Sequence, residues 1–103
     1  MPGINLQSPS AGEILQKEFM DELGLSQNAL ARAINVPANR IHAIVHNLRR
    51  ITADTDLRLC KFFGLSEGYF LRLQTSCEIM TTKRSIASAL SNILPYDKNI
   101  RAA

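Results

Sequence analysis

The sequence predicts an all-α fold, in which a compact domain of five helices is followed by an additional C-terminal helical segment. Three observations lead to this prediction. Apolar residues recur every three or four positions along most of the chain, which is the period of a helix with one buried side. Residue types that begin and end helices stand at the boundaries of these stretches. The 103 residues are enough for one hydrophobic core and too few for two.

The first helix is expected over residues 11–23. Ser10 and Glu13 have the spacing of a capping box, in which each side chain accepts a hydrogen bond from the other residue's backbone N–H. Gly24 supplies a left-handed end to the helix. The apolar stripe between these boundaries consists of Leu15, Phe19 and Leu23.

Two short helices follow, separated by a tight turn. Ser26 is the expected N-cap of a helix spanning roughly Gln27 to Ile34. Asn35 tolerates a positive φ angle, and Pro37 suits the first position of the next helix, so the segment between the two helices is predicted to be a turn. The buried face of the next helix is predicted to contain Ile41, Ile44, Val45 and Leu48.

The fourth helix is expected between an N-cap at Thr52 and a left-handed end at Gly64. Asp54 and Asp56 lie in its first turn, where negative charge complements the helix dipole. Ser66 is the expected N-cap of a fifth helix. The fifth helix carries an apolar stripe at heptad-like spacing, made by Phe70, Leu73, Cys77 and Met80.

This stripe has two interpretations of equal weight: it packs on the domain's own core, or it forms the seam of a homodimer. We take it as the predicted dimer interface. An amphipathic stretch over residues 86–94 follows, and Pro95 stops it. The expected division is an N-terminal tail over 1–10, a five-helix domain over 11–80, for which the DNA-binding evidence follows, and a C-terminal helix with a frayed tail over 81–103.

The DNA-binding prediction comes from residues 26–50, which contain four arginines, two histidines and no acidic residue. Two short helices joined by a tight turn, with small Ala31 where they approach, make a helix-turn-helix whose second helix enters the major groove of DNA. Arginine, asparagine and the alanine methyl group suit guanine, adenine and thymine, so Ala38, Asn39, Arg40 and Ala43 are expected near base edges. Phosphate contacts are expected from Gln27, Asn47, Arg49 and Arg50. The complete predicted set is Gln27, Pro37, Ala38, Asn39, Arg40, His42, Ala43, His46, Asn47, Arg49 and Arg50.

Enzymatic and metal-binding functions find little support in the sequence. His42 and His46 have a spacing that metal sites use, but no third ligand is evident, so a phosphate-facing or neutral pair is expected. Cys60 and Cys77 fall on apolar stripes and are expected to be reduced core thiols. No glycine-rich phosphate loop, H-E-x-x-H or G-x-S-x-G motif occurs. We expect no catalytic residues, no metal and no cofactor.

The overall composition fits a cytoplasmic protein with a polyanionic partner. The chain is 46% hydrophobic and 20% charged, with a net charge of +3. It contains no apolar run long enough for a membrane span and no secretory signal pattern at its start. We therefore expect a protein of the cytoplasm that has no membrane partner.

The stretch "LSQNALARAINVPANRIHAIVHNLRRITADTDLRLCKFFGLS" resembles the phage-repressor-like helix-turn-helix class, and within it the HigA-type antitoxins of bacterial toxin–antitoxin modules. The resemblance covers about residues 11–80, and its most specific parts are "AGEIL", "RITADTDLRL" and "FGLSEGYFLRLQ". It implies a five-helix DNA-binding fold, a homodimer on a double-stranded DNA operator, repression of the module's own operon, and neutralisation of a HigB-type toxin that cleaves messenger RNA.

The sequence departs from the family pattern in three places. Asn35 replaces the usual glycine of the turn, Leu48 and Arg50 replace glycines in the following loop, and "CEI" replaces an aromatic–acid pair after "LQ". An alternative function stays open, namely a free-standing helix-turn-helix repressor without a toxin partner. A toxin-sized reading frame beside the gene would distinguish the antitoxin from the repressor.

Overall fold

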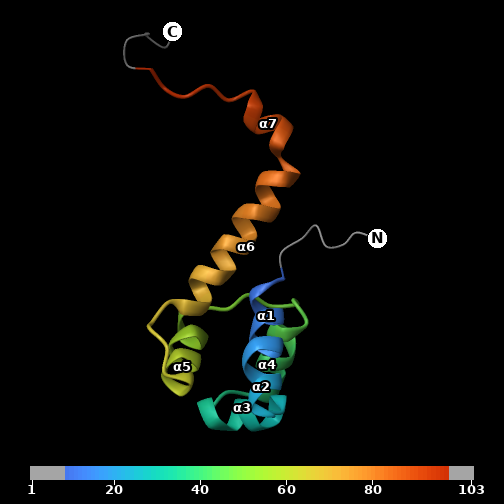
Figure 1. The fold of residues 1–103 in the computed structure, drawn as a ribbon, viewed down its shortest axis with the longest axis vertical. Helices are drawn as coiled ribbons and strands as arrows, with labels where there is room; N and C mark the ends of the chain where they lie inside the picture. Colours follow the sequence, from blue (N-terminus) through green and yellow to red (C-terminus); the bar gives the residue numbers. More distant parts are fainter. Residues whose placement is uncertain (1–8, 98–103) are drawn as a thin grey trace.

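The computed structural model describes residues 9–97, and within this part of the chain all regular structure is helical. The predicted all-α class is therefore confirmed. Most of the helices form a compact body, from which α6 extends and carries α7 beyond it (Figure 1). The helices in chain order are α1 (Ala11–Ile14), η2 (Leu15–Met20), α2 (Asp21–Leu23), α3 (Gln27–Ile34), α4 (Ala38–Val45), α5 (Ala53–Phe63), α6 (Tyr69–Ser85) and α7 (Ala87–Ser91).

The first three segments form one continuous rod whose middle, η2, has the wider π-type turn. The predicted capping box is confirmed at its start: Ser10 Oγ accepts from the Glu13 N–H at 3.1 Å, and Glu13 Oε1 accepts from the Ser10 N–H at 2.8 Å. The rod ends at Gly24, whose φ of 65° is the left-handed conformation that glycine adopts without strain. The local sequence signals therefore set both ends of this helix.

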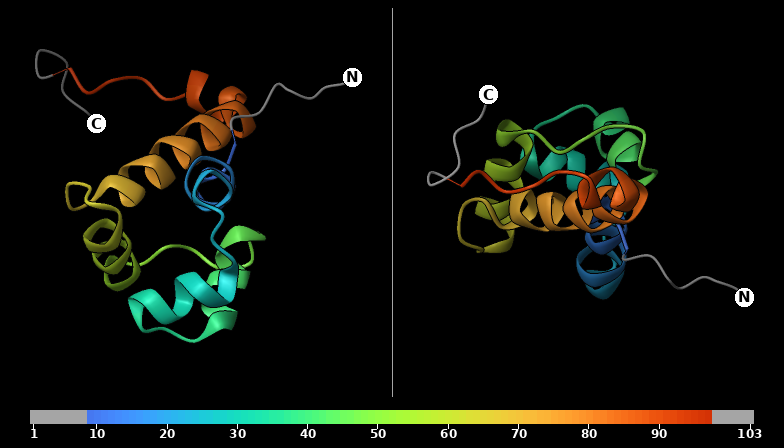
Figure 2. Two further views of the ribbon diagram at one scale, coloured as in Figure 1. Left: turned by 60° about the horizontal axis from the view of Figure 1, so that its bottom comes forward. Right: turned by 90° about the horizontal axis from the view of Figure 1, so that it is seen from above.

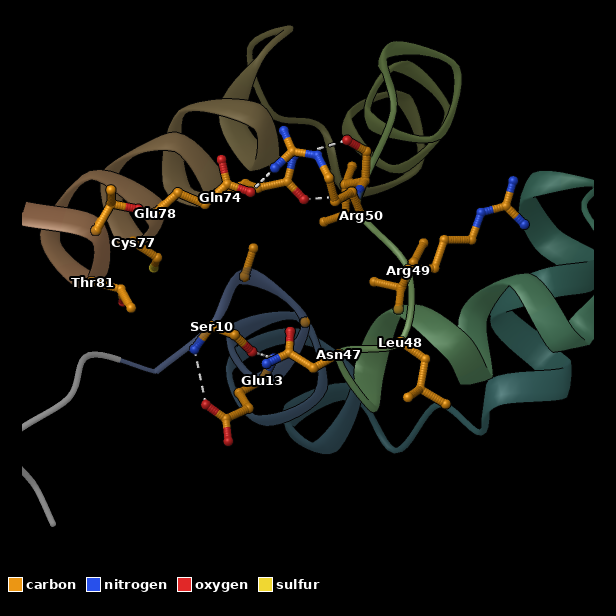
Figure 3. A pocket seen from close by; sticks show the side chains of 15 residues that line it. Ser10, Glu13, Asn47, Leu48, Arg49, Arg50, Gln74, Cys77, Glu78 and Thr81 are labelled. Carbon is orange, nitrogen blue, oxygen red and sulfur yellow. Dashed lines mark hydrogen bonds and ion pairs between the residues drawn. The ribbon is translucent and has the colours of Figure 1, made fainter. Parts of the chain in front are cut away.

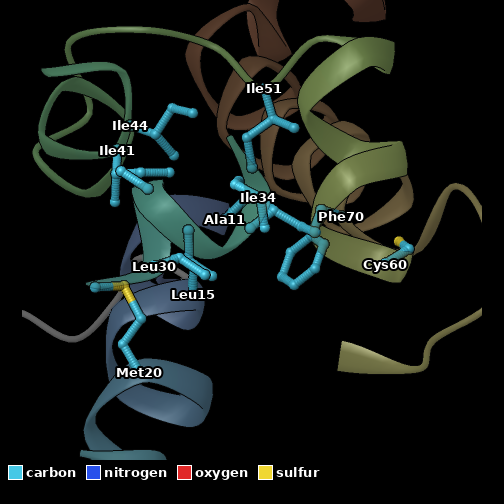
Figure 4. Close-up of a cluster of buried hydrophobic side chains, with 12 residues drawn as sticks. Ala11, Leu15, Met20, Leu30, Ile34, Ile41, Ile44, Ile51, Cys60 and Phe70 are labelled. Atoms are coloured by element: carbon cyan, nitrogen blue, oxygen red, sulfur yellow. The ribbon is translucent and has the colours of Figure 1, made fainter. Parts of the chain in front are cut away.

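A single hydrophobic core joins the helices of the body (Figure 4). Phe19 lies beside it, with ring centroids 5.0 Å from Phe63 and 5.3 Å from Phe70. Each large apolar side chain buried in this way contributes roughly 1.5–3 kcal/mol to folding. The buried members are Ala11, Leu15, Met20, Leu30, Ala31, Ile34, Ile41, Ile44, Ile51, Leu59, Cys60 and Phe70.

The backbone of α1 lies directly against the end of α4. A Cβ atom added at Gly12 would overlap the carbonyl oxygen of Ile44 and lie within 2.9 Å of the carbonyl carbon. Backbone cannot move aside as a flexible side chain can, so only glycine allows this approach. Position 12 thereby sets how closely α1 and α4 pack.

A buried carboxylate from α5 caps the start of α6. Asp56 is fully buried; its Oδ2 accepts from the Gly68 N–H at 2.7 Å, and its Oδ1 accepts from the N–H groups of Phe70 and Leu71 at 2.9 and 3.2 Å. The expected N-cap at Ser66 was wrong, because α6 begins at Tyr69 and its N-cap residue is Gly68, with no side chain to cap the helix. Asp56 supplies the missing acceptor from another helix.

Only the first half of α6 packs on the body. Gln74 is buried there, where its Oε1 accepts from the Ile51 N–H at 2.7 Å and its Nε2 donates to the Ile51 carbonyl at 2.9 Å. Residues 79–97 are all exposed. Figure 2 shows α6 crossing over the start of α1, with α7 continuing past it. The domain boundary expected at residue 80 falls inside α6, which continues unbroken to Ser85.

Candidate nucleic-acid interface

Helices α3 and α4 form the expected helix-turn-helix. Ser26 Oγ accepts from the Ala29 N–H at 3.0 Å and caps α3, as predicted. Asn35 adopts φ 60°, ψ 54°, and the next N–H, of Val36, bonds to the Ala31 carbonyl at 2.9 Å. Asn35 thus adopts the left-handed conformation at a position where the family pattern has glycine. The replacement of glycine by asparagine therefore leaves the turn intact.

The two sides of α4 differ sharply. Ile41 and Ile44 are buried in the core. Since successive residues are 100° apart around a helix, the opposite side carries a different set of side chains. The exposed residues of this helix and of its immediate ends are Pro37, Ala38, Asn39, His42, His46 and Asn47, while Ala43 is half-buried beside them.

The two histidines and Gln27 lie together on this exposed face. The ring centroids of His42 and His46 are 4.2 Å apart, and His42 Nδ1 lies 3.3 Å from Gln27 Oε1. An amide oxygen only accepts hydrogen bonds, so this contact places the proton on Nδ1 and leaves Nε2 available to a partner. Three of the predicted residues, from two helices, therefore form one polar cluster. In the described residues no group of three or more His, Cys, Asp or Glu side chains could hold a metal ion.

Arg40 lies elsewhere than its predicted position near base edges would require. Its side chain is only 22% exposed and points to α5, where Nη1 donates to Asp54 Oδ2 at 2.8 Å and to Thr55 Oγ1 at 3.5 Å. Its Nε is buried without a hydrogen-bond partner in the described structure. On the helix, Arg40 lies on the edge of the buried side, about 160° from His42 by the 100° rotation per residue.

Arg58, which no sequence pattern indicated as a site residue, completes this cluster. Its Nε donates to Asp54 Oδ2 at 3.0 Å, and its Nη1 donates to the carbonyls of Ile34 and Asn35 at 2.9 and 3.3 Å. These carbonyls are at the end of α3, inside the turn of the helix-turn-helix. The hydrogen bonds from Arg58 and then from Arg40 hold the pKa of Asp54 below its ordinary value of 3.8.

The loop after α4 presents its two arginines differently. Arg50 forms an ion pair with Glu78 of α6, whereas Arg49 is exposed and extends away from α6 (Figure 3). Within residues 9–97, Arg49 has no ion pair or hydrogen bond. Asn47 has a φ of 64°, so it also serves the backbone turn that ends α4. The loop, the start of α1 and α6 together line a groove of about 580 Å³.

The four residues of the predicted dimer stripe lie in different environments. Phe70 is fully buried in the core of its own chain, and Leu73 packs against that core, so these two belong to the domain interior. Cys77 is half-buried and donates its S–H to the Pro9 carbonyl at 2.9 Å. Met80 is 49% exposed. Heptad spacing could not separate a stripe that packs inward from one that faces a partner.

The exposed apolar surface lies further along the same helix. Ile79 is 60% exposed, and both Ile86 and Leu90 are 41% exposed. They share a shallow groove of about 540 Å³ on α6 and α7, lined by Thr75, Glu78, Ile79, Thr82, Lys83, Ile86 and Leu90. No helix of the described residues is long and apolar enough to cross a membrane.

Comparisons with known proteins agree with this geometry. A family model described as helix-turn-helix matches residues 16–70. "Virulence-associated protein I" of Dichelobacter nodosus is 39% identical over 101 residues, which span 98% of this chain and 88% of that protein. The structure of an addiction module antidote protein of a HigA family from Coxiella burnetii is similar with a TM-score of 0.80 at 36% identity, covering 88% of this chain and 100% of that one. The Pseudomonas aeruginosa antitoxin HigA, solved with the higBA promoter, gives a TM-score of 0.79 at 34% identity, covering 87% and 100%.

Proposed function

The chain belongs to the helix-turn-helix family and is of the HigA antitoxin type, and from this premise we propose that it is a dimeric operator-binding antitoxin of the cytoplasm. It represses the operon that encodes it and neutralises an mRNA-cleaving toxin. It acts by binding rather than catalysis.

The exposed, acid-free face of α4 is the observation that carries the DNA-binding part of this proposal. Asn39, His42 and His46 lie on that face, and Gln27 from α3 contacts it. Asparagine and histidine side chains donate and accept the hydrogen bonds that base edges offer in the major groove. We assign base contacts to these residues. Arg49 is assigned to a phosphate, because its guanidinium is exposed and free of an ion pair within residues 9–97.

A palindromic operator has two half-sites, and each half-site takes one copy of α4. DNA recognition therefore depends on the dimer interface, which we call the seam. A two-fold dimer places its recognition helices about 34 Å apart, in successive major grooves of a palindromic operator. We propose that the seam is the groove on α6 and α7, with Ile79, Ile86 and Leu90 as its apolar centre. Glu78 and Lys83 line the same groove, and opposite charges in one self-complementary patch favour pairing with a second copy.

A titration tests the proposal. The purified protein is titrated against a duplex from upstream of its own gene and against a scrambled duplex, each at two salt concentrations. Tight selective binding with two chains per operator is expected, with affinity that falls as salt rises because phosphate contacts release counterions. Equal, weak binding to both duplexes would refute operator recognition.

Toxin neutralisation has its own test. The neighbouring reading frame is expressed alone and together with this chain, and growth and messenger RNA integrity are measured. Rescue of growth by co-expression, with co-purification of the two proteins, is expected for an antitoxin. A neighbour that is harmless alone would favour the free-standing repressor.

A further inference from the structure

Two arginines, one from α4 and one from α5, meet at one carboxylate oxygen beside the helix-turn-helix. Asp54 Oδ2, in the first turn of α5, accepts from Arg40 Nη1 on α4 at 2.8 Å and from Arg58 Nε at 3.0 Å. Arg58 extends this link to the end of α3, where its Nη1 donates to the carbonyls of Ile34 and Asn35. The recognition helix is thereby attached to α5 through Asp54, and the turn before it is attached to α5 through Arg58, whose guanidinium Asp54 also holds.

We infer that Asp54 is a positioning residue for selective DNA binding, acting through Arg40 and Arg58 rather than by touching DNA. The inference rests on the proposed operator binding and adds a residue that determines its specificity. Its basis is the placement of the two arginines. Arg40 extends from α4 to Asp54 on α5, and Arg58 extends from α5 past Asp54 to the end of α3, so both guanidinium groups are engaged away from the exposed face of α4.

The way α4 is held explains why such a link matters. The helix has only eight residues, and its N-cap, Pro37, makes no side-chain capping hydrogen bond. Ile41 and Ile44 anchor its buried side, but apolar contacts alone define rotation and sliding of a helix loosely. The Arg40 link adds a directional contact in the first turn, on the edge of the buried side.

Contacts to base edges, which give sequence selectivity, need more precise placement of side chains than contacts to phosphates do. Hydrogen bonds to base edges require side chains placed to within about 0.5 Å, whereas attraction to phosphates tolerates larger displacement. Asp54 has a side-chain exposure of 57%, and ion pairs so exposed contribute little to folding stability. Loss of the link therefore lowers the preference for operator over scrambled DNA much more than it lowers stability.

The test compares Asp54→Asn, Arg40→Gln and the double variant with the wild-type chain, using the operator and scrambled duplexes defined above. The readout is the ratio of the two affinities, because removing a carboxylate raises affinity for every duplex and this effect cancels in the ratio. Glu67→Gln is the matched control, since it removes an equal charge from an exposed side chain outside the cluster.

Asp54→Asn is expected to lower the affinity ratio about tenfold or more, the discrimination worth a single base contact. The melting temperature should stay within about 5 °C of wild type, and Glu67→Gln should leave the ratio unchanged. Adding Asp54→Asn to Arg40→Gln should lower the ratio far less than Asp54→Asn does in the wild-type chain, because part of the link is already lost. This non-additivity is the mark of an effect transmitted through Arg40.

Three results in the variants would overturn the inference alone. An unchanged ratio in Asp54→Asn would show that the link does not affect specificity. A loss of both affinities in proportion to the unfolded fraction, measured by circular dichroism, would show a merely structural role. A rise in scrambled-duplex affinity with a salt slope steeper by about one would show that Asp54 withholds Arg40 from phosphates. A wild-type chain that fails to discriminate between the duplexes would refute operator binding itself, and this inference with it.

Discussion

Replacing Asp56 with alanine should destabilise the protein more than any other single loss of a polar side chain in the described structure. The carboxylate is fully buried and accepts hydrogen bonds from three backbone N–H groups at the start of α6, at 2.7, 2.9 and 3.2 Å. Hydrogen bonds to a charged acceptor are each worth about 1.5–3 kcal/mol. Removing the carboxylate also ends the cost of burying it, which offsets part of this loss.

We therefore expect Asp56→Ala to lower the free energy of unfolding by about 3–5 kcal/mol, which is what remains of three such hydrogen bonds after that offset. Most of the loss comes from the Phe70 N–H, which is buried and would have no acceptor, whereas water reaches the other two donors more easily. The melting temperature should fall by roughly 12–40 °C, at about 4–8 °C per kcal/mol for a domain of this size.

The measurement is urea unfolding followed by circular dichroism, at one fixed chain concentration because dimerisation links stability to concentration. Asp21→Ala is the matched control: Asp21 is exposed and accepts one hydrogen bond, from Gln16, so its loss should cost under about 1 kcal/mol. If Asp56→Ala lowered the free energy of unfolding no more than this control does, water would have replaced the carboxylate. Capping of α6 by Asp56 would then not stabilise the protein.

The remaining predictions concern DNA binding, assembly and pH. Asn39→Ala should cost about 1–3 kcal/mol on operator DNA and relax the preference at one base position per half-site, while Arg49→Ala should weaken all duplexes alike; equal losses on operator and scrambled DNA for both variants would contradict the assignment. Ile79→Glu should give a folded monomer in analytical ultracentrifugation, whereas Thr81→Glu, at an exposed position outside the apolar groove, should remain dimeric; a dimeric Ile79→Glu chain would place the seam elsewhere. The lowered pKa of Asp54 means that its contribution to stability is present above pH 3.8 and disappears as pH falls through the folded-state value. The difference in melting temperature between wild type and Asp54→Asn should therefore vanish on acidification below pH 3.8, and a difference that persists at pH 2 would refute the ionic origin of the effect.

The sequence predicted features whose cause is local. The capping box of Ser10 and Glu13, the N-cap at Ser26 and the left-handed Asn35 all depend on residues within three or four positions, and each is confirmed. The sequence could not predict contacts between distant residues. Asp56 caps a helix whose N-cap residue, Gly68, lies twelve positions later, and Arg58 reaches carbonyls more than twenty positions earlier, so no local pattern contains either contact.

The candidate interface likewise combines features that follow from the local sequence with features that depend on contacts between distant residues. Asn39, His42 and His46 were selected because they lie in an acid-free segment, and the structure brings the two histidines to one exposed face with Gln27. Arg40 was selected on the same grounds, but its direction depends on Asp54, an acid just outside the segment that folding brings beside α4. Net charge along the sequence therefore pointed to residues that the structure brings to one exposed face, while the orientation of each arginine depended on tertiary pairing.

The contact between Gly12 and the backbone of Ile44 affects how a mutational scan of this protein would be interpreted. A scan that selects for repression scores each substitution by a cellular phenotype. Any side chain at position 12 would force the start of α1 and the end of α4 apart. Position 12 would then be ranked beside the DNA contacts, although it has no side chain with which to make one. Pairing the repression screen with a measurement of cellular protein abundance would reveal whether variants at this position lose the fold or only the alignment of α4.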